Sequence, residues 1–513
     1  MSSADAFYVT TPIYYVNDLP HVGHAYTTLA CDTIARFARL DGRRVWFLTG
    51  TDEHGQKVEK AAAAAGLAPQ AFTDRVSQRF RELAERMQIS HDDFIRTTEA
   101  RHKAGVQALW RELVRRDQIY LGTYAGWYSV RDESFYAESE LDDGLAPTGA
   151  PVEWVEEPSY FFRLSAWQEP LLRHYDEHPD FILPATRRNE VVRFVEGGLQ
   201  DLSVSRTSFR WGIPVPDDPD HVIYVWLDAL TNYMTGIGFP DTDATLYRTF
   251  WPADVHVVGK DILRFHAVYW PAFLLAAGLA PPRRVFAHGW WTNEGQKISK
   301  SLGNVIDPLQ LIEEYGLDQT RYFLLREVPF GNDGDFSRGA MISRMNRDLA
   351  NDYGNLVQRV LALIQRNCAG RLPEPGDLTG DDRGLLEAAE RLLDEVRAAM
   401  AGQALSRALE SIFELVGTAN RYVDVQAPWA LRKSDPARMA TVLYVLAEAI
   451  RRLALLTQAF LPDASARILD QLAVAADART LAHCRDGSAM LRPGGRHRPA
   501  CSRASQASGT DAG

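Results

Sequence analysis

The sequence predicts an α/β protein in which a parallel sheet is interrupted by an inserted module and followed by an α-helical domain. Two strand–helix–strand units predict the sheet, one at residues 7–49 and the other at residues 255–291. Between them, residues 124–205 are rich in Gly, Pro, acidic and aromatic residues, which indicates an inserted α/β module. After Asp307 the pattern is helical nearly throughout, to about Leu469, and predicts a separate helical domain.

The first unit opens with residues 7–15, where aromatic, β-branched and apolar residues alternate as in a buried strand. After a loop, apolar residues from Leu29 to Leu40 recur at roughly helical spacing until Gly42 ends the run. Residues 45–49 (VWFLT) then form a second short apolar strand. Such a unit is the start of a parallel sheet.

The second unit is expected to contain a strand at residues 255–258, a largely apolar helix at residues 261–277 and another strand at residues 284–291. The C-terminal stretch has a different character. From about Arg485 it contains Gly, Ser, Ala and Arg without periodicity, so we expect it to be partly disordered.

Size and composition limit the class of protein. A chain of 513 residues exceeds a single-core domain. No stretch approaches ~20 uncharged apolar residues, and the N-terminus has no basic region followed by an apolar run, so neither a membrane-spanning helix nor a secretory signal is predicted. Four scattered cysteines are too few for a disulfide framework, which predicts a reducing, cytoplasmic setting. The net charge of −11 argues against a general nucleic-acid binder but leaves room for a local basic patch.

A His-Val-Gly-His motif, from His21 to His24, lies where the first strand leads into a helix. Backbone N–H groups and the helix dipole favour anions at such a turn, and two imidazoles three residues apart can donate hydrogen bonds to phosphate oxygens. Gly23 lets a flat base approach the backbone. The motif therefore indicates nucleotide binding, although a helix start with two incidental histidines is an equal alternative for the motif alone.

A second motif, Lys297-Ile298-Ser299-Lys300-Ser301, lies in a polar loop just after a strand of the second unit. Two lysines that bracket hydroxyl groups can neutralise a triphosphate as charge moves onto pyrophosphate. For an isolated pair of lysines, a solvated basic loop is the commoner explanation.

Together the two motifs resemble those of the class I aminoacyl-tRNA synthetases, in which HVGH lies on the first half of a split fold and KISKS follows the second half. Six sequence blocks in the right order narrow the resemblance to the methionyl-tRNA synthetases and cover about residues 6–470. The blocks read TTPIYYVNDLPHVGHAY, FLTGTDEHGQK, YVWLDALTNY, VVGKDILRFHAVYWPA, HGWWTNEGQKISKSLGN and NRYVDVQAPW.

The resemblance implies a fold and an activity. The implied fold is a class I synthetase Rossmann-like catalytic domain, split by an inserted module and followed by an α-helical anticodon-binding domain. Its segments are the first catalytic half at 1–115, the connective module at 116–205, the second half with the KISKS loop and a stem-contact region at 206–340, the anticodon-binding domain at 341–470 and a tail at 471–513. The implied activity is ATP-dependent activation of L-methionine to methionyl-adenylate and its transfer to the 3′ end of tRNA(Met), with ATP bound as its Mg²⁺ complex.

The resemblance also implies a methionine pocket lined mainly by aromatic rings. Such a pocket suits a thioether, because sulfur–ring contacts are favourable and rigid rings fix the shape. Asp52 would accept a hydrogen bond from the ammonium group of the substrate. For each aromatic residue, ordinary core packing is the alternative. The implied set is Ile13, Tyr15, Asp52, Trp226, Ala229, Tyr233, Phe265, His266 and Trp270.

For ATP the resemblance implies a set that includes both motifs, whose histidines and lysines are the expected catalytic groups. One further member, Arg206, lies in a plainer stretch, SVSRTSFRWG, where a surface salt bridge is the alternative. The implied set is His21, Gly23, His24, Arg206, Asp261, Lys297 and Lys300.

A third set lies in the predicted helical domain. Asn351, Asn355 and Arg359 are spaced four apart, which places them on one helical face. In the family that the sequence resembles, these positions read the CAU anticodon, and the residue matching Trp429 stacks on an anticodon base. Amide and guanidinium groups suit base edges, and a ring suits a base face. Polar surface residues and a buried tryptophan are the alternatives.

The inserted module departs from the family pattern. Many members carry Cys-x-x-Cys zinc knuckles there, but no cysteine occurs between Cys31 and Cys368, so four-cysteine coordination is impossible. We therefore expect no metal ligands and no structural zinc. The C-terminal tRNA-binding and dimerisation module of some relatives is also absent, which predicts a monomer.

Two other functions share part of this evidence. A class I synthetase for leucine, isoleucine, valine or cysteine carries the same two motifs. The lack of a large editing insertion, the absence of zinc-ligating cysteines and the aromatic pocket set argue against this alternative. A non-catalytic tRNA-binding scaffold would be expected to lose the histidines or lysines of the motifs, and all four are present.

Overall fold

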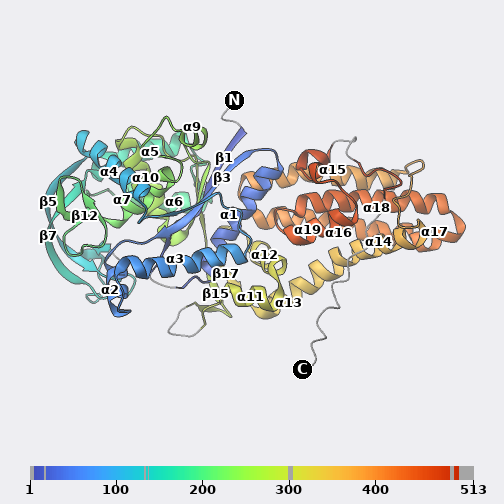
Figure 1. The fold of residues 1–513 in the computed structure, drawn as a ribbon, viewed down its shortest axis with the longest axis horizontal. Helices are drawn as coiled ribbons and strands as arrows, with labels where there is room; N and C mark the ends of the chain where they lie inside the picture. The colour runs from blue at the N-terminus through green and yellow to red at the C-terminus, as the bar shows by residue number, and fades with distance from the viewer. Residues whose placement is uncertain are drawn as a thin grey trace, which may run out of the picture. The chain divides into compact units, whose positions relative to one another are not determined.

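The computed structural model describes residues 5–16, 19–131, 134–136, 138–298, 304–485 and 490–495 (Figure 1). The chain divides into two compact units. The first comprises residues 1–35, 43–309 and 331–334, and the second comprises residues 36–42, 310–330 and 335–513.

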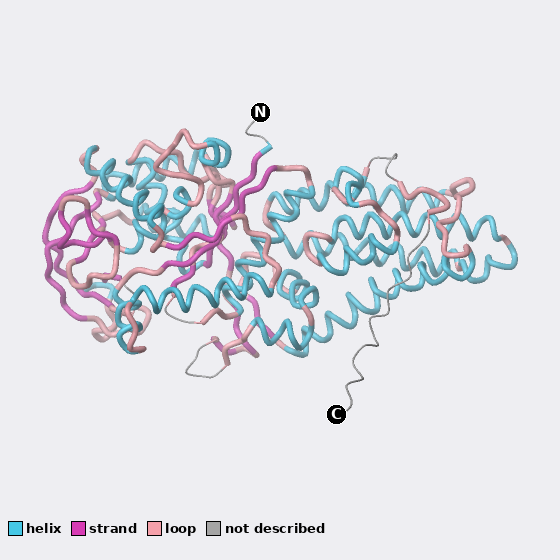
Figure 2. Tube along the Cα trace, viewed as in Figure 1, coloured by secondary structure: helices cyan, strands magenta, loops and turns pink. Residues whose placement is uncertain are grey.

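A seven-stranded parallel sheet forms the core of the first unit, as the sequence predicts, and is drawn in magenta in Figure 2. The strand order is β2-β3-β1-β13-β14-β8, and β4 also pairs with β3. All these pairs are parallel. The strands are β1 (Ala6–Thr10), β2 (Tyr14–Tyr15), β3 (Arg44–Asp52), β4 (Asp93–Arg96), β8 (Ile182–Leu183), β13 (Val255–Gly259) and β14 (Val285–His288).

The strand order reverses beside β1. The chain passes from β1 to β3 on one side, and β13 pairs with the other side of β1 much later in the sequence. In open α/β sheets, ligands bind outside the carboxyl ends of the strands at such a reversal. The topology therefore places the candidate site at the carboxyl edge formed by β1, β3 and β13.

The expected strand at residues 7–15 is in fact two short strands. Pro12 has no backbone N–H to donate to a neighbouring strand, and the ladder is interrupted between β1 and β2. After the interruption, β2 pairs with the end of β3, where Tyr15 faces Asp52. The break thus brings two predicted site residues side by side.

The first unit contains a series of helices, of which α4 to α10 contribute residues to its main hydrophobic core. The helices are α1 (Val22–Leu40), α2 (Gln56–Ala64), α3 (Pro69–Arg86), α4 (Ala100–Arg115), α5 (Gln168–Glu177), α6 (Ala185–Glu196), α7 (Val225–Leu230), α8 (Asn232–Thr235), α9 (Thr245–Phe250) and α10 (Trp270–Ala276). The predicted helix before Gly42 corresponds to α1.

The helix expected at residues 261–277 is not one regular α-helix. It consists of a 3-10 turn (Lys260–Ile262), a π-helical turn (Phe265–Tyr269) and α10. Pro271 has no N–H to donate to the carbonyl oxygen of Ala267, four residues earlier. That oxygen instead accepts a hydrogen bond from the Tyr175 hydroxyl, at 2.7 Å. The wide turn before α10 is thus explained by the proline and stabilised from α5.

An antiparallel sheet with the order β6-β5-β7-β9 lies in the segment predicted as the insertion. Its main feature is a long hairpin of β5 (Ile119–Ser129) and β7 (Glu153–Phe162), flanked by β6 (Ser134–Tyr136) and β9 (Leu202–Ser203). Strand β8, between α5 and α6, instead pairs with β14 of the main sheet. Part of the predicted insertion therefore contributes to the parallel sheet.

Two small sheets complete the first unit. One has the order β10-β12-β11 and is antiparallel, with β10 (Ser205–Arg206), β11 (Ile213–Val215) and β12 (Asp218–Ile223). The other contains the antiparallel pair β15 (Trp291–Asn293) and β16 (Gln296–Lys297). The predicted strand at residues 284–291 is therefore divided between β14 and β15.

The second unit is largely helical, as the sequence predicts. Helix α18 (Pro436–Thr457) is buried almost along its whole length from Met439 and packs against α14 to α17 and α19. The other elements are α11 (Pro308–Tyr315), α12 (Leu317–Arg326), β17 (Gly334–Phe336), α13 (Arg338–Arg344), a π-helical segment (Met345–Gly354), α14 (Asn355–Asn367), α15 (Gly380–Ala401), α16 (Leu405–Gln426), α17 (Pro428–Ser434) and α19 (Pro462–Gln471).

Within the residues that the structure describes, no helix combines the length and the apolar character needed to cross a membrane. The tail that we expect to be partly disordered falls mostly outside these residues, since only residues 490–495 are described after Arg485.

Candidate active site

The residues predicted to bind methionine come from different parts of the first unit. Ile13 and Tyr15 follow β1, Asp52 ends β3, Trp226, Ala229 and Tyr233 lie on α7 and α8, and Phe265, His266 and Trp270 lie on the helical segment after β13. Several direct contacts join members of this set.

Tyr233 and His266 form a buried hydrogen-bonded pair. The Tyr233 hydroxyl lies 2.6 Å from Nε2 of His266, and Nδ1 of the same ring lies 2.9 Å from the carbonyl oxygen of Ile262. A carbonyl oxygen only accepts, so Nδ1 carries the proton and the Tyr233 hydroxyl donates to Nε2. Burial lowers the pKa of His266 to about 4, so the ring is neutral near pH 7.

The Tyr233 ring is fixed by its neighbours. It stacks on His256 with ring centroids 4.0 Å apart and lies 6.1 Å from the ring of Trp270. The Tyr8 hydroxyl donates to the Tyr233 carbonyl oxygen at 2.7 Å. Burial raises the pKa of the Tyr233 hydroxyl, and the negative charge of Asp52 adds to this effect. Tyr233 therefore remains a neutral hydrogen-bond donor in the vicinity of a carboxylate.

Trp226 and Phe265 form a flat aromatic wall. Their ring centroids are 3.4 Å apart and their planes differ by 8°. Both rings are half-buried and pack against the main core, as does Ile13. Because aromatic faces attract a polarizable sulfur, this wall suits a thioether side chain.

Asp52 is the charged member of the set. Asp52 is 6% exposed, and its backbone carbonyl oxygen accepts a hydrogen bond from the backbone N–H of Val16 at 3.1 Å. The same strand end pairs with Tyr15. A carboxylate in this position can bind a cationic group that enters the site from solvent.

The two histidines of the HVGH motif lie against each other at the start of α1, with ring centroids 3.9 Å apart. Nδ1 of His21 accepts a hydrogen bond from the Gly23 N–H, and Nδ1 of His24 accepts one from the His21 N–H, each at 3.1 Å. In the neutral rings the remaining proton is therefore on Nε2. Burial, followed by the nearby His21, lowers the pKa of His24 well below its usual value, which keeps that ring neutral.

The segment just after the KISKS motif, from Asn304 onward, is hydrogen-bonded to the HVGH helix. The Val22 N–H donates to the carbonyl oxygen of Ile306 at 3.1 Å, and the Asn293 side chain donates to the carbonyl oxygen of Asn304 at 2.9 Å. Asn304 and Ile306 lie just after the KISKS motif. Lys300 itself lies outside the described residues, and for Lys297 the structure describes only the backbone, in β16.

Asp261 is exposed on the 3-10 turn after β13, where its Oδ1 accepts a hydrogen bond from Nε1 of Trp290 at 3.0 Å. The neighbouring Lys260 lies over the same indole ring, 4.3 Å from its centroid, and pairs with Asp333 at 2.6 Å. The turn therefore presents a carboxylate at the carboxyl end of β13.

Arg206 is 2% exposed and already has several partners. Its Nη1 donates to the Ser203 hydroxyl and to the Ser205 carbonyl oxygen, each at 2.6 Å. Its guanidinium lies 3.9 Å from the ring centroid of Tyr224 and pairs with Glu157 at 3.8 Å. The salt bridge that was the alternative for Arg206 is present, but it is buried rather than at the surface. A contact of Arg206 with ATP stays a prediction.

In the second unit, the structure brings together part of the predicted anticodon set. Arg359 on α14 donates to Asp424 at 3.0 Å, and its guanidinium lies 5.9 Å from the ring centroid of Trp429. Trp429 on α17 is 48% exposed, so the ring is available to stack on another ring. Asn351 and Asn355 are exposed where the π-helical segment meets α14.

Two polar residues that directly follow Asp52, Glu53 and His54, were not predicted from the sequence to have a role. Glu53 is fully buried and accepts hydrogen bonds from Arg96 on both oxygens, at 2.6 and 2.9 Å. Its Oε2 also accepts from Thr98 at 2.5 Å. A run of three polar residues at the end of an apolar parallel strand was the signal that could have identified them.

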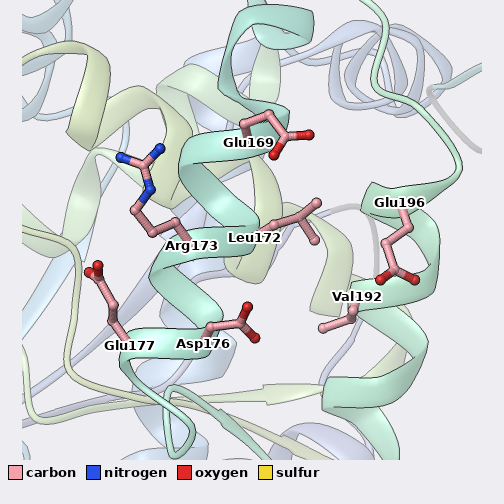
Figure 3. A pocket seen from close by; sticks show the side chains of 7 residues that line it. All are labelled: Glu169, Leu172, Arg173, Asp176, Glu177, Val192 and Glu196. Carbon is pink, nitrogen blue, oxygen red and sulfur yellow. The ribbon is translucent and has the colours of Figure 1, made fainter.

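A surface hollow of about 520 Å³ between α5 and α6 contains none of the predicted site residues (Figure 3). Four carboxylates and Arg173 line it together with two aliphatic side chains. Its charges face solvent, and its position on α5 and α6 separates it from the residues of the candidate site.

The comparison with protein families gives the class of protein. The family described as "tRNA synthetases class I (M)" matches residues 7–150 and 145–361, and the "Anticodon binding domain of methionyl tRNA ligase" matches residues 372–498. Together with the parallel sheet and the two motifs, these matches define a class I aminoacyl-tRNA synthetase with a helical anticodon-binding domain.

Individual relatives give the particular family. A methionine–tRNA ligase of Rickettsia felis is 55% identical over 95% of this chain and 97% of its own length, and one of Mycobacterium bovis is 56% identical over 93% of each. The structure of Mycobacterium tuberculosis methionyl-tRNA synthetase in complex with methionyl-adenylate is similar with a TM-score of 0.94 and 55% identity, over 96% of this chain and 98% of that one. The chain belongs to the methionyl-tRNA synthetase family.

The lowered pKa of His266 predicts a pH dependence of stability. Between its usual value of 6.5 and the folded value of about 4, the unfolded chain binds a proton that the folded protein excludes. The free energy of unfolding should therefore fall as the pH drops through this window, by up to about 1.4 kcal/mol per pH unit for this one group. Above pH 6.5 the ring is neutral in both states and contributes no slope.

Urea unfolding of the wild type and of His266→Gln, at steps from pH 7.5 to pH 4.5, measures this contribution. The glutamine variant cannot be protonated, so its stability should fall less steeply with pH. Parallel slopes for the two proteins would show that His266 is not held neutral in the folded state.

Proposed function

We propose that this chain, an ATP-dependent methionine–tRNA ligase, activates methionine at the carboxyl edge of its parallel sheet and selects its tRNA with the helical domain. In the first step the carboxylate of methionine attacks the α-phosphate of ATP, which forms methionyl-adenylate and releases pyrophosphate. In the second step the terminal ribose of tRNA attacks the activated carbonyl. No side chain forms a covalent intermediate, because positioning and charge stabilisation supply the rate.

The neutral Tyr233–His266 pair beside the Asp52 carboxylate is the observation that carries the proposal. Methionine combines an uncharged thioether side chain with a cationic ammonium group. The stacked rings of Trp226 and Phe265 suit the thioether, and Asp52 suits the ammonium group. Since the His266 ring is neutral near pH 7, it adds no positive charge next to the ammonium group. Ile13, Tyr15, Ala229 and Trp270 complete the proposed pocket.

The ATP site is proposed at the start of α1 and in the KISKS loop. The neutral rings of His21 and His24 carry their protons on Nε2, from which they can donate to phosphate oxygens. ATP would bind as its Mg²⁺ complex. Lys297 and Lys300 would neutralise the negative charge that moves onto the pyrophosphate leaving group. The hydrogen bond between Val22 and Ile306 supports a common site for the two motifs. Gly23, Asp261 and Arg206 are proposed as further ATP contacts.

We propose that the inserted module contains no structural zinc. The support is the chemistry of its side chains: no cysteine occurs between Cys31 and Cys368, so the thiolate ligands typical of structural zinc are missing. Within the described residues, no group of three or more His, Cys, Asp or Glu side chains is arranged to hold a metal ion. The hairpin of β5 and β7 depends instead on packing, such as the edge-to-face contact of Trp127 with Trp154 at 5.3 Å.

We propose the division of the chain that the sequence predicts, except that β8, within the connective segment, belongs to the parallel sheet. The catalytic halves are residues 1–115 and 206–340, the connective module is residues 116–205, the anticodon-binding domain is residues 341–470, and a tail follows at residues 471–513. The enzyme is proposed to act as a monomer in the cytoplasm, where its substrates tRNA, ATP and methionine meet.

The anticodon is proposed to bind at the face formed by Asn351, Asn355, Arg359 and Trp429. The half-exposed ring of Trp429 and the adjacent guanidinium of Arg359 support the proposal, because together they offer a stacking surface and donors for base edges.

ATP–pyrophosphate exchange with each of the twenty amino acids tests the proposed reaction. Exchange should be efficient with methionine alone. Lys300→Ala should lower it by about 10²-fold or more, because it removes a charge that stabilises the transition state. Lys60→Ala, which removes the same charge from an exposed position on α2, is the control and should exchange normally. Exchange within a few-fold of wild type for Lys300→Ala would rule out its phosphate role.

Elemental analysis tests the proposal on zinc. The purified protein should contain no stoichiometric zinc and should keep its activity after chelation, once Mg²⁺ is restored. One zinc per chain, or an activity that returns only with added zinc, would contradict the proposal and require ligands other than cysteine.

Substitution of Trp429 separates anticodon binding from the chemistry. Trp429→Ala removes a stacking partner worth ~1–3 kcal/mol, so tRNA charging should fall about tenfold or more while pyrophosphate exchange, which needs no tRNA, is unchanged. Arg359→Ala should act similarly and weaken discrimination against tRNAs with other anticodons. If exchange and charging fall equally, Trp429 has a structural role, and if neither falls, the anticodon binds elsewhere.

A further inference from the structure

A carboxylate on α7, Asp228, is buried between two histidines that come from other elements. Its Oδ2 lies 2.7 Å from Nδ1 of His54, in the turn after β3, and its Oδ1 lies 2.8 Å from Nε2 of His102, on α4. The three side chains are 0–2% exposed. We call them the His54–Asp228–His102 cluster, and none of them belongs to the site described above.

Asp228 is ionised in this environment. Burial alone would raise its pKa, but the two histidines outweigh burial and hold the pKa at about 2. Each carboxylate oxygen therefore accepts one ring N–H, and both hydrogen bonds are charge-assisted. Such bonds are short and directional, so they fix the relative positions of the three elements that supply the side chains.

The cluster connects the walls of the proposed methionine pocket. His54 is two residues after Asp52, and Asp228 lies on one helical turn with Trp226 and Ala229. The hydrogen bond between His54 and Asp228 thus ties the strand end that carries the proposed ammonium partner to the helix that carries the aromatic wall.

Helix α4 anchors this connection from behind. Nδ1 of His102 lies 2.9 Å from the Thr235 hydroxyl, two residues after Tyr233. A Cβ atom on Gly105 would lie only 2.3 Å from Cγ2 of Thr235, so glycine permits the close contact of α4 with α8. The cluster therefore joins β3, α7, α8 and α4, three of which carry proposed pocket residues.

On the basis of the proposed methionine pocket, we propose that His54 and His102 are positioning residues which, through Asp228, set the spacing between the Asp52 carboxylate and the Trp226 wall and so determine the affinity for methionine. The ammonium group and the side chain of one amino acid must reach these two groups at once. A small change in their spacing would weaken methionine binding without touching the ATP site.

The choice of residues favours this role over simple packing. Ionised groups in a protein interior lose their hydration, and apolar side chains of similar size often stabilise a core as well or better. A cluster of directional hydrogen bonds offers what apolar packing does not, namely a defined geometry between segments that are far apart in the sequence.

The two histidines use different ring nitrogens, which provides a reciprocal test. The amide nitrogen of asparagine lies near the position of Nδ1 in histidine, and that of glutamine lies near Nε2. His54→Asn and His102→Gln should therefore keep the hydrogen bond to Asp228, whereas His54→Gln and His102→Asn should misplace it. At each histidine, the asparagine and glutamine variants both lose the ring. They differ in where they place the amide nitrogen.

Methionine-dependent ATP–pyrophosphate exchange supplies the readout. We expect His54→Gln and His102→Asn to raise KM for methionine about tenfold, with KM for ATP and kcat within about threefold of wild type. His54→Asn and His102→Gln should stay within about threefold for all parameters. Leu113→Ala, which removes a buried side chain about three turns further along α4, is the control for general destabilisation and should lower Tm without raising KM for methionine.

If the histidine variants do not fold, substitutions of Thr235 test the positioning role with a smaller change to the protein. Thr235→Val removes the hydroxyl beside His102 while keeping the shape, and it should raise KM for methionine about fivefold, as expected for the loss of one hydrogen bond of about 1 kcal/mol. Thr235→Ser keeps the hydroxyl and should not. If the asparagine and glutamine variants behave alike, or if Thr235→Val matches wild type, the positioning role is wrong. Absence of methionine-dependent exchange in the wild type would instead overturn the proposed function itself.

Discussion

The pairing of β1 with β3 on one side and with β13 on the other is the constraint on which the site depends. Carboxyl ends of parallel strands meet at one edge, so this pairing brings together segments that are some 200 to 250 residues apart. One segment supplies Asp52, one supplies the HVGH helix, and one supplies His266. The break at Pro12 adds Tyr15 to the same edge. Because the backbone ladder fixes these positions, the side chains at the edge can be specialised for chemistry rather than for holding the fold together.

Local patterns in the sequence were sufficient to predict the first strand–helix–strand unit, the helical second unit and the place of the HVGH motif at the start of a helix. They were not sufficient where a partner lies far away in the chain. The missing N–H of Pro271 is visible in the sequence, but the hydroxyl that takes its place comes from Tyr175, 92 residues from the carbonyl that it reaches. The return of β8 to the main sheet is hidden for the same reason, since two apolar residues are too short a signal. The family resemblance supplied the residues proposed for the pocket, whereas the protonation state of the Tyr233–His266 pair required distances.

Charge is distributed around the pocket in a consistent way. The aromatic wall and the Tyr233–His266 pair are neutral, while Asp52 is acidic. Behind Asp52 the next two residues are buried, Glu53 in an ion pair with Arg96 and His54 in a hydrogen bond with the carboxylate of Asp228. Buried charges of this kind retain their form only when each has a partner. The strand end therefore combines a carboxylate that we propose to bind the substrate, Asp52, with neighbours whose buried side chains are bonded to other parts of the protein.

Because of the π-helical turn at Phe265–Tyr269, the shape of the proposed pocket can change in a way that substitutions alone cannot produce. Successive residues of an α-helix are rotated by ~100° about its axis, so a wide turn accommodates an additional residue by shifting the angular register of everything that precedes it. Removal of one residue between Phe265 and Tyr269 would turn the residues before the deletion by about 100°, and so move Phe265 away from Trp226, while the rest of α10 kept its place. During evolution, the shape of the proposed pocket can therefore change through an insertion or deletion in this helix, and not only through exchange of the side chains that line it.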